Sequence, residues 1–127
     1  MDPKIKNKKV LFVEDDEANQ YYLGLILEEM GCSFELASNG QEAVDKVRGT
    51  KFNIIFMDLR MPVMDGFKAT QIIRQQIDQN IFIVAISANV VPEIVDQCIA
   101  AGMNGFIAKG VDVEKFESEM LSWIVKS

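Results

Sequence analysis

The sequence predicts an α/β fold in which helices cover both faces of a parallel β-sheet. Short apolar runs of strand length alternate five times with amphipathic stretches of helix length. Strict alternation of this kind is typical of right-handed βαβ units, whose strands lie parallel. Stop and start signals separate the units, with Gly31 and Gly102 at helix ends and Pro92 in a first helical turn.

The first unit shows the pattern most clearly. The apolar run at 9–14 ends on a carboxylate, and the helix expected over 17–31 carries an apolar stripe. The second unit pairs the half-buried alternation at 33–37 with a short helix over 39–49 opened by Asn-Gly. Both units therefore place a strand before an amphipathic helix.

The other three units repeat this order. The predicted strands are residues 52–58, 81–87 and 105–109, and the predicted helices are residues 65–77, 90–102 and 112–126. Asp65 is the expected N-cap of its helix, and Asp16 is expected to help start the first helix. Trp123 is expected to pack the last helix on the sheet.

Length and composition indicate one domain. The chain has 127 residues, 49% hydrophobic and 25% charged, which is ordinary for a folded domain. Four of the first nine residues are lysines. We therefore expect residues 1–8 to be a solvated lead-in and residues 9–127 to form the single domain. Cys32 and Cys98 are expected to be buried free thiols of a reducing cytosol.

Charge and hydropathy exclude two classes of partner. No apolar run approaches the roughly 20 residues that cross a bilayer, and the first residues are no signal peptide. The formal net charge of −6 disfavours nucleic acid, because that binding depends on Lys and Arg neutralising phosphates. A cytoplasmic protein without membrane or nucleic-acid contacts is therefore expected.

Polar residues collect where the predicted strands end. The strand-end residues are Glu14, Asp15 and Asp16, then Asp58, Ser87 and Lys109. In the doubly wound order 2-1-3-4-5, the four strands that carry them are neighbours, and ligands bind beyond their carboxyl ends. Three carboxylates there suit Mg²⁺, an aspartate can form an acyl phosphate, and a hydroxyl and an ammonium can bind phosphoryl oxygens.

Four motifs give the chain a family resemblance. They are VLFVEDDEANQ, IIFMDLRMPVMDG, IVAISA and GMNGFIAK, in this order. From about residue 8 onward the chain resembles the receiver domain of two-component response regulators, especially receivers of hybrid sensor kinases and phosphorelays. The resemblance implies a flavodoxin-like (βα)5 sandwich with a five-stranded parallel sheet of order 2-1-3-4-5.

The resemblance also implies roles for the strand-end residues. Asp58 would be the phosphoacceptor, Asp15 a direct Mg²⁺ ligand and Glu14 a ligand through water. The main-chain carbonyl of Arg60 would complete the metal shell. Arg60 and Asn89 would flank the path of the water that hydrolyses the acyl phosphate, and we expect the bulk of Arg60 to slow that step.

Ser87 would be the switch hydroxyl and Lys109 the phosphate-binding lysine. Phe106 would be the aromatic residue whose rotamer follows the state of Ser87, although the residue alone is more typical of a core. Most receivers have proline after this lysine, in a cis bond, whereas this chain has Gly110. Since a cis bond without proline costs about 2.5–4 kcal/mol, we predict that Lys109–Gly110 is trans or locally mobile.

The predicted function is a phosphorylatable switch that turns over no separate substrate and only gains and loses its own phosphoryl group. The chain has no histidine, so the phosphohistidine must come from elsewhere, on a histidine kinase or a histidine phosphotransfer protein. The controlled partner would act in trans or lie on a longer parent chain.

Three alternative functions belong to other classes of protein. The acids after the first strand exclude a flavodoxin-type FMN carrier, which needs a hydroxyl- and glycine-rich loop there. A haloacid-dehalogenase-type phosphatase would place its nucleophile after the first strand, whereas Asp58 ends the third. The remaining alternative is a degenerate receiver that serves as a phosphorylation-independent docking module, for which Gly110 is the best argument.

Overall fold

The computed structural model describes residues 5–88, 91–109 and 112–127. The strands are β1 (Lys9–Val13), β2 (Ser33–Ala37), β3 (Ile54–Asp58), β4 (Phe82–Ser87) and β5 (Gly105–Ala108). The helices are α1 (Glu17–Met30), α2 (Gly40–Gly49), α3 (Gly66–Gln76), α4 (Pro92–Ala101) and α5 (Val113–Lys126). Each predicted element is present, with its ends within two residues of the expected positions.

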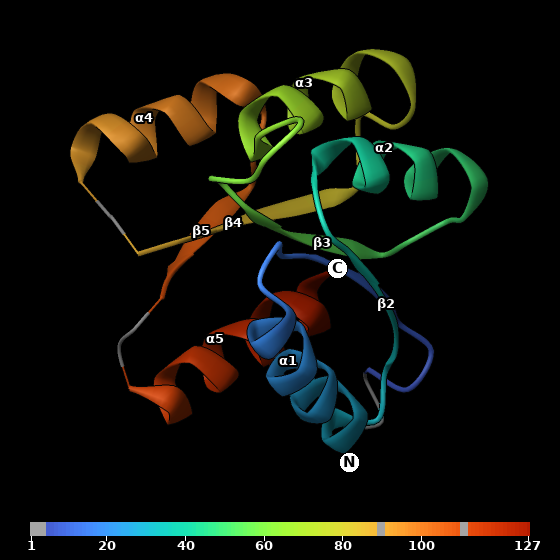
Figure 1. Cartoon of the computed structure of the whole chain (residues 1–127). Helices are drawn as coiled ribbons and strands as arrows, with labels where there is room; N and C mark the ends of the chain where they lie inside the picture. The colour runs from blue at the N-terminus through green and yellow to red at the C-terminus, as the bar shows by residue number, and fades with distance from the viewer. Residues whose placement is uncertain (1–4, 89–90, 110–111) are drawn as a thin grey trace.

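The strands form one parallel sheet in the order β2-β1-β3-β4-β5, which confirms the predicted fold. Helices α1 and α5 lie on one face of the sheet and α2, α3 and α4 on the other (Figure 1). Because all the strands are parallel, their carboxyl ends lie on one side of the molecule.

Two hydrophobic cores, one on each face, hold the sheet in place. Alternate residues of β1 divide between them: Leu11 and Val13 face the core under α2, α3 and α4, whereas Val10 and Phe12 face the core under α1 and α5. Side chains on both faces of the central strands are fully buried. This burial explains why the central strands are continuous apolar runs rather than alternating ones.

The predicted helix ends are confirmed. The Asp16 carboxylate accepts a hydrogen bond from the Ala18 N–H at 2.8 Å, and Asp65 accepts one from the Lys68 N–H at 2.9 Å. Gly31 and Gly102 follow the ends of α1 and α4 with φ of 85° and 102°, a left-handed conformation that favours glycine. The N-caps Asp16 and Asp65 set where α1 and α3 begin, beside the ends of β1 and β3.

The expectation of a solvated lead-in is wrong at one residue. Lys6 and Asn7 are exposed, but Ile5 is 1% exposed and belongs to the core under α1 and α5. The Lys8 ammonium donates a hydrogen bond to the main-chain carbonyl of Ser127, which joins this segment to the end of α5. A single apolar residue among lysines gave no periodic signal, and the division at residue 8 remains a prediction.

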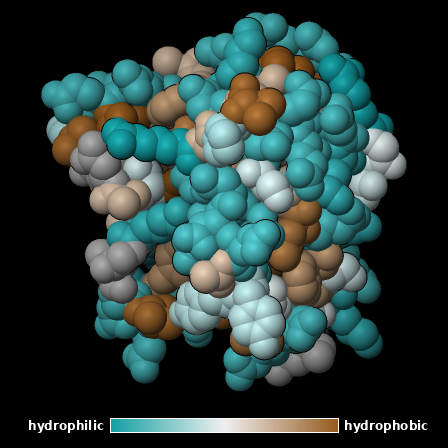
Figure 2. Space-filling model, in the orientation of Figure 1, coloured by the Kyte–Doolittle hydropathy of each residue, from teal (hydrophilic) through white to brown (hydrophobic). Residues whose placement is uncertain are grey.

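Cys32 and Cys98 are buried and free, as expected. Burial raises the pKa of both thiols, because a thiolate is poorly solvated there, so neither is poised for nucleophilic chemistry. Among the described residues, no helix is long and apolar enough to cross a membrane. The face in Figure 2 is mostly hydrophilic, with separate hydrophobic patches.

The two glycines Gly24 and Gly105 offer a test of the packing. A Cβ on Gly24 would lie 3.6 Å from the Phe34 ring, an ordinary contact, so Gly24→Ala should stabilise the fold by about 0.5–1 kcal/mol through helix propensity. A Cβ on Gly105 would lie 2.3 Å from the Trp123 ring, so Gly105→Ala should destabilise it by about 1–3 kcal/mol. Urea unfolding of both variants measures the two changes, and a stabilised Gly105→Ala would contradict the packing of Trp123 on β5.

Candidate functional site

The strand register brings the predicted site residues to one edge of the sheet. Val13 pairs with Met57 and Asp58 with Ile86, so Glu14 follows β1 level with Asp58 at the end of β3. Ser87 pairs with Ala108 in turn, so Lys109 follows β5 next to the end of β4. The row expected from strand order 2-1-3-4-5 is therefore present.

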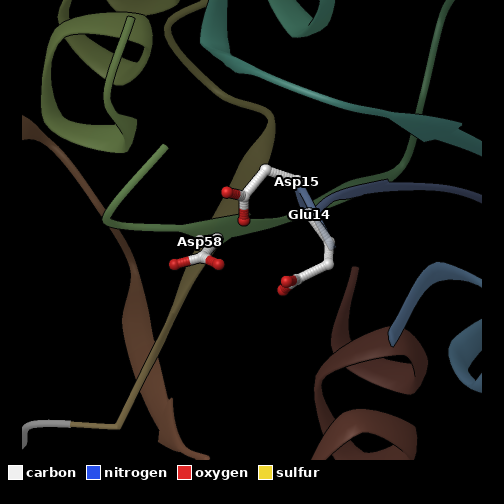
Figure 3. Close-up of side chains that lie close together, drawn as sticks. All are labelled: Glu14, Asp15 and Asp58. Atoms are coloured by element: carbon white, nitrogen blue, oxygen red, sulfur yellow. The ribbon is translucent and has the colours of Figure 1, made fainter. Parts of the chain in front are cut away.

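Three carboxylates converge at this edge. Glu14, Asp15 and Asp58 each offer an oxygen, and these three oxygens lie within 4.8 Å of one another. In Figure 3 the Glu14 and Asp15 side chains leave the end of β1 and the Asp58 side chain leaves β3, and their carboxylates lie close together. Glu14 is 1% exposed and Asp58 7%, whereas Asp15 is exposed.

The Glu14 side chain and main chain are held on every side. Its Oε1 accepts hydrogen bonds from the Asn19 amide Nδ2 at 3.2 Å and from the Asp16 N–H at 3.4 Å, and its Oε2 accepts one from Lys109 Nζ at 2.8 Å. The Gln20 amide donates to its main-chain carbonyl at 2.5 Å. A buried carboxylate needs such partners, because it has lost its water.

Asp58 is held by one charged and one neutral donor. Its Oδ2 lies 3.0 Å from Lys109 Nζ, and its Oδ1 accepts from the Arg60 N–H at 3.1 Å. Gly66 allows α3 to approach the end of β3, because a Cβ there would lie 2.4 Å from the main-chain oxygen of Asp58. The Asp58 carboxylate is therefore fixed in direction before any ligand binds.

Lys109 is the positive charge between the two buried carboxylates. Burial by itself lowers the pKa of its ammonium, but hydrogen bonds and charge attraction from Glu14 and Asp58 outweigh that effect and raise the pKa above 10.5. The lysine is thus firmly charged at neutral pH. Three carboxylates against one ammonium leave the site with excess negative charge.

One pocket of about 360 Å³ contains every predicted site residue. It is lined by Glu14, Asp15, Asp16, Asn19, Asp58, Leu59, Arg60, Ser87, Ala88 and Lys109. The donor set fits Mg²⁺, which prefers oxygen ligands and keeps several waters, and whose opposite ligands lie roughly 4 Å apart. The structure thus brings together the acids, the hydroxyl and the ammonium that the strand ends predicted, while their individual roles remain proposals.

Three expectations concern other residues. Phe106 is 40% exposed on β5, so the core placement typical of a lone phenylalanine is wrong. Asn89 and the Lys109–Gly110 bond lie outside the described residues, and the predictions about them stay predictions. Asp16 lines the pocket but is used as the cap of α1, as expected.

Three residues at the site did not emerge from the sequence. Asn19 and Gln20 contact Glu14 from the first turn of α1, and Gly66 permits the close approach of α3 to Asp58. Asn19 and Gln20 could have been found only from their position in the first turn of a helix that begins beside the acidic residues. Asn and Gln are also common at exposed positions of a first turn, so this position alone predicts little.

A second hollow adjoins the site between α1 and α5, with a volume of about 510 Å³. Its lining is mostly apolar and includes Phe12, Tyr22 and Phe116, with Asn19 and Lys109 shared with the acidic pocket. Asn19 thus lies between the charged site and a mostly apolar surface.

Comparison with known proteins gives relatives over nearly the whole chain. Hybrid signal transduction histidine kinase A of Dictyostelium discoideum is 34% identical over 128 residues, which cover 97% of this chain and 6% of the relative. Osmosensing histidine protein kinase SLN1 of Saccharomyces cerevisiae is 38% identical over 116 residues, which cover 87% of this chain and 10% of the relative. The chain thus spans a tenth or less of the length of these relatives.

Solved structures show the same fold. The receiver domain of sensor histidine kinase PA1611 from Pseudomonas aeruginosa, crystallised with magnesium in its active-site cleft, has a TM-score of 0.83 and 30% identity over 95% of this chain and 99% of its own. A chain of the co-crystal of the Saccharomyces cerevisiae histidine phosphotransfer protein Ypd1 with the receiver domain of Ssk1 has a TM-score of 0.85 and 32% identity, covering 94% of this chain and 90% of its own.

The family model of the response regulator receiver domain matches residues 10–120, from the second residue of β1 into α5. The same residues carry the acidic pocket at the carboxyl ends of the strands. The chain therefore belongs to the response regulator receiver domain family.

Proposed function

We propose that this chain is a phosphoacceptor switch in which Asp58 takes a phosphoryl group from a phosphohistidine of another protein or domain. One observation carries the proposal: the buried Asp58 carboxylate lies 3.0 Å from the Lys109 ammonium in a pocket shared with Glu14 and Asp15. Nucleophile, counter-ion and metal-type ligands are what phosphoryl transfer requires in one place.

The transfer is a displacement at phosphorus. One Asp58 carboxylate oxygen attacks in line with the nitrogen–phosphorus bond of the donor. The new oxygen–phosphorus bond forms as that bond breaks, and its electron pair returns to the imidazole, which takes up a proton. Hydrogen bonding of Asp58 Oδ1 to the Arg60 N–H limits rotation of the carboxylate during attack.

Glu14, Asp15, Asp58 and the main-chain carbonyl of Arg60 would hold the metal, with Glu14 acting through water. Mg²⁺ bound there supplies charge neutralisation at the phosphoryl oxygens. Support comes from the spacing of the three carboxylate oxygens, and from the magnesium in the cleft of the PA1611 receiver domain. Asp15 is exposed, so it is accessible to an ion from solvent.

Lys109 and Ser87 would bind the oxygens of the transferred group. Lys109 now neutralises Glu14 and Asp58, and we infer that its ammonium moves to a phosphoryl oxygen when the metal and the phosphoryl group are present. Ser87 lies at the end of β4 and lines the same pocket, which supports a role in which its hydroxyl would donate a second hydrogen bond. A shift of Ser87 with the half-exposed Phe106 would change the surface near β5.

The donor would be a histidine phosphotransfer protein or a histidine kinase. The chain has no histidine of its own, and its relatives include hybrid histidine kinases. The Ssk1 receiver domain, bound to Ypd1 in the co-crystal, supports the first of these donors. We place the transfer in the cytoplasm, in line with the two free cysteines, and the controlled partner in trans or on a longer parent chain.

The phosphorylated form would return to the starting state by hydrolysis in the same pocket. Water attacks phosphorus, the bond to the Asp58 oxygen breaks, inorganic phosphate leaves, and the carboxylate is restored. Since the only group that reacts is the chain's own aspartate, no separate substrate is turned over. Arg60 and Asn89 would flank the approach of that water.

Asp58→Asn should abolish phosphorylation, because an amide cannot form the acyl phosphate. The wild-type protein, incubated with Mg²⁺ and acetyl phosphate, should gain the mass of one phosphoryl group in an intact-mass measurement. Asp45→Asn is the control, since Asp45 is an aspartate on α2 whose carboxylate accepts from Gln41, away from the pocket. A wild-type protein that gains no mass would refute the proposal and favour the docking-module alternative.

Arg60→Ala should shorten the lifetime of the phosphorylated protein, because the side chain at the pocket rim no longer obstructs the attacking water. The decay of the phosphorylated mass is followed after the small phosphodonor is removed. Arg48→Ala is the control, because Arg48 contacts Gln76 away from the site. An unchanged lifetime for Arg60→Ala would contradict this role of Arg60.

Lys109→Met should destabilise the metal-free protein, because it leaves the buried Glu14 and Asp58 without their counter-ion. The folded state raises the pKa of Lys109, so its contribution is complete below its unfolded pKa of 10.5 and is lost as pH rises through the higher folded pKa. The difference in unfolding free energy between wild type and Lys109→Met should therefore persist from neutral pH to about pH 10 and then shrink. A difference that grows above that pH, in urea unfolding, would contradict the ion pairs.

A further inference from the structure

The Asn19 side chain is the feature that the proposed function leaves unexplained. Its amide Nδ2 donates to Glu14 Oε1 at 3.2 Å, and its side chain lines the acidic pocket. Asn19 is neither charged nor a strand-end residue, and no step of phosphoryl transfer requires an amide. Its only described side-chain hydrogen bond goes to a residue that would control the metal.

The local sequence places this amide with little freedom. Asp16 caps α1 by accepting hydrogen bonds from the Ala18 N–H at 2.8 Å and the Asn19 N–H at 3.3 Å. The cap fixes the main chain of Asn19 in the first turn of α1, so its side chain lies over the end of β1. Gln20, the next residue, holds the main-chain carbonyl of Glu14. Two adjacent side-chain amides of α1 thus bind the side chain and the main chain of Glu14.

The two oxygens of Glu14 have different kinds of partner. Oε2 is paired with the Lys109 ammonium at 2.8 Å, and Oε1 is held by the Asn19 amide at 3.2 Å and the more distant Asp16 N–H at 3.4 Å. If Lys109 moves to a phosphoryl oxygen, Oε2 loses its protein partner. The carboxylate is 1% exposed, so bulk water cannot replace that partner from all directions.

We propose that Asn19 is a positioning residue for phosphoryl transfer: its amide keeps the Glu14 carboxylate in place when Lys109 leaves it for the phosphoryl group. This inference rests on the proposed function. It predicts that Asn19 acts through Glu14 and not by contact with the phosphoryl group. Removal of the amide should let the carboxylate turn away from the metal site, which weakens Mg²⁺ binding and slows transfer together.

The test is a double-mutant cycle of Asn19→Ala, Glu14→Gln and the double variant. Asn19→Ala should lower the rate of mass gain with acetyl phosphate at saturating Mg²⁺ roughly tenfold, the size expected from one hydrogen bond to a charged group. In the Glu14→Gln background the same change should alter the rate less than about twofold, because the partner carboxylate is already gone. Rates that fall by the same factor in both backgrounds would overturn the proposal.

The matched control is Gln41→Ala. Gln41 lies in the first turn of α2, and its amide donates to the Asp45 carboxylate at 3.0 Å, the same type of bond away from the site. This variant should phosphorylate and bind Mg²⁺ like the wild type. Thermal unfolding of both variants tests whether a loss of stability explains the slower phosphorylation of Asn19→Ala. If the rate returns to the wild-type value when the assay temperature is lowered by the loss in Tm, the positioning role of Asn19 is contradicted.

Two measurements do not depend on phosphorylation. Calorimetric Mg²⁺ titration should show weaker binding by Asn19→Ala than by the wild type, and equal or tighter binding would overturn the proposal. In the metal-free protein, Glu14→Gln should shift the side-chain amide resonances of Asn19 in an NMR spectrum. Unchanged resonances would also overturn the proposal. If the two variants show these effects but the wild-type protein gains no phosphoryl mass, only the proposed function is refuted.

Discussion

The interaction on which the site depends is the contact of one ammonium with two buried carboxylates. Glu14 and Asp58 are almost fully buried, and Lys109 Nζ lies 2.8 Å from one and 3.0 Å from the other. Buried carboxylates without a counter-ion are strongly destabilising, so this lysine makes the site tolerable in the absence of a cation. In the proposed function, the same ammonium would bind the incoming phosphoryl group. Stability and phosphoryl binding would then use one charge.

The fold supplies the rigidity that this arrangement needs. Glu14, Asp58, Ser87 and Lys109 lie at the ends of four neighbouring strands. Three of these strands, β1, β3 and β4, are packed on both faces. Side chains at the ends of such strands are held more precisely than side chains on long loops. The first turn of α1 adds the Asn19 amide from above the sheet edge. The charged groups therefore have defined partners before a ligand arrives.

Much of the fold followed from local patterns, and the exceptions have physical reasons. The spacing of apolar residues and the helix-capping residues predicted every element. Strands buried on both faces are continuous apolar runs, and a capping Asp marks the start of a helix in the sequence. Ile5 was missed because one apolar residue among lysines has no period, although it is 1% exposed in the structure. Gly66 was missed as a site residue, because a sequence does not show that the Asp58 main chain passes close to it.

The sequence by itself determined the order of elements, the residues at the strand ends and the lack of a histidine, because these are properties of neighbours along the chain. Only the tertiary structure decided that Lys109 pairs with both Glu14 and Asp58, and that the Asn19 amide holds the other oxygen of Glu14. Lys109 and Glu14 are 95 positions apart. Their distance depends on register, burial and side-chain direction, which are set when the sheet assembles and not by any local pattern.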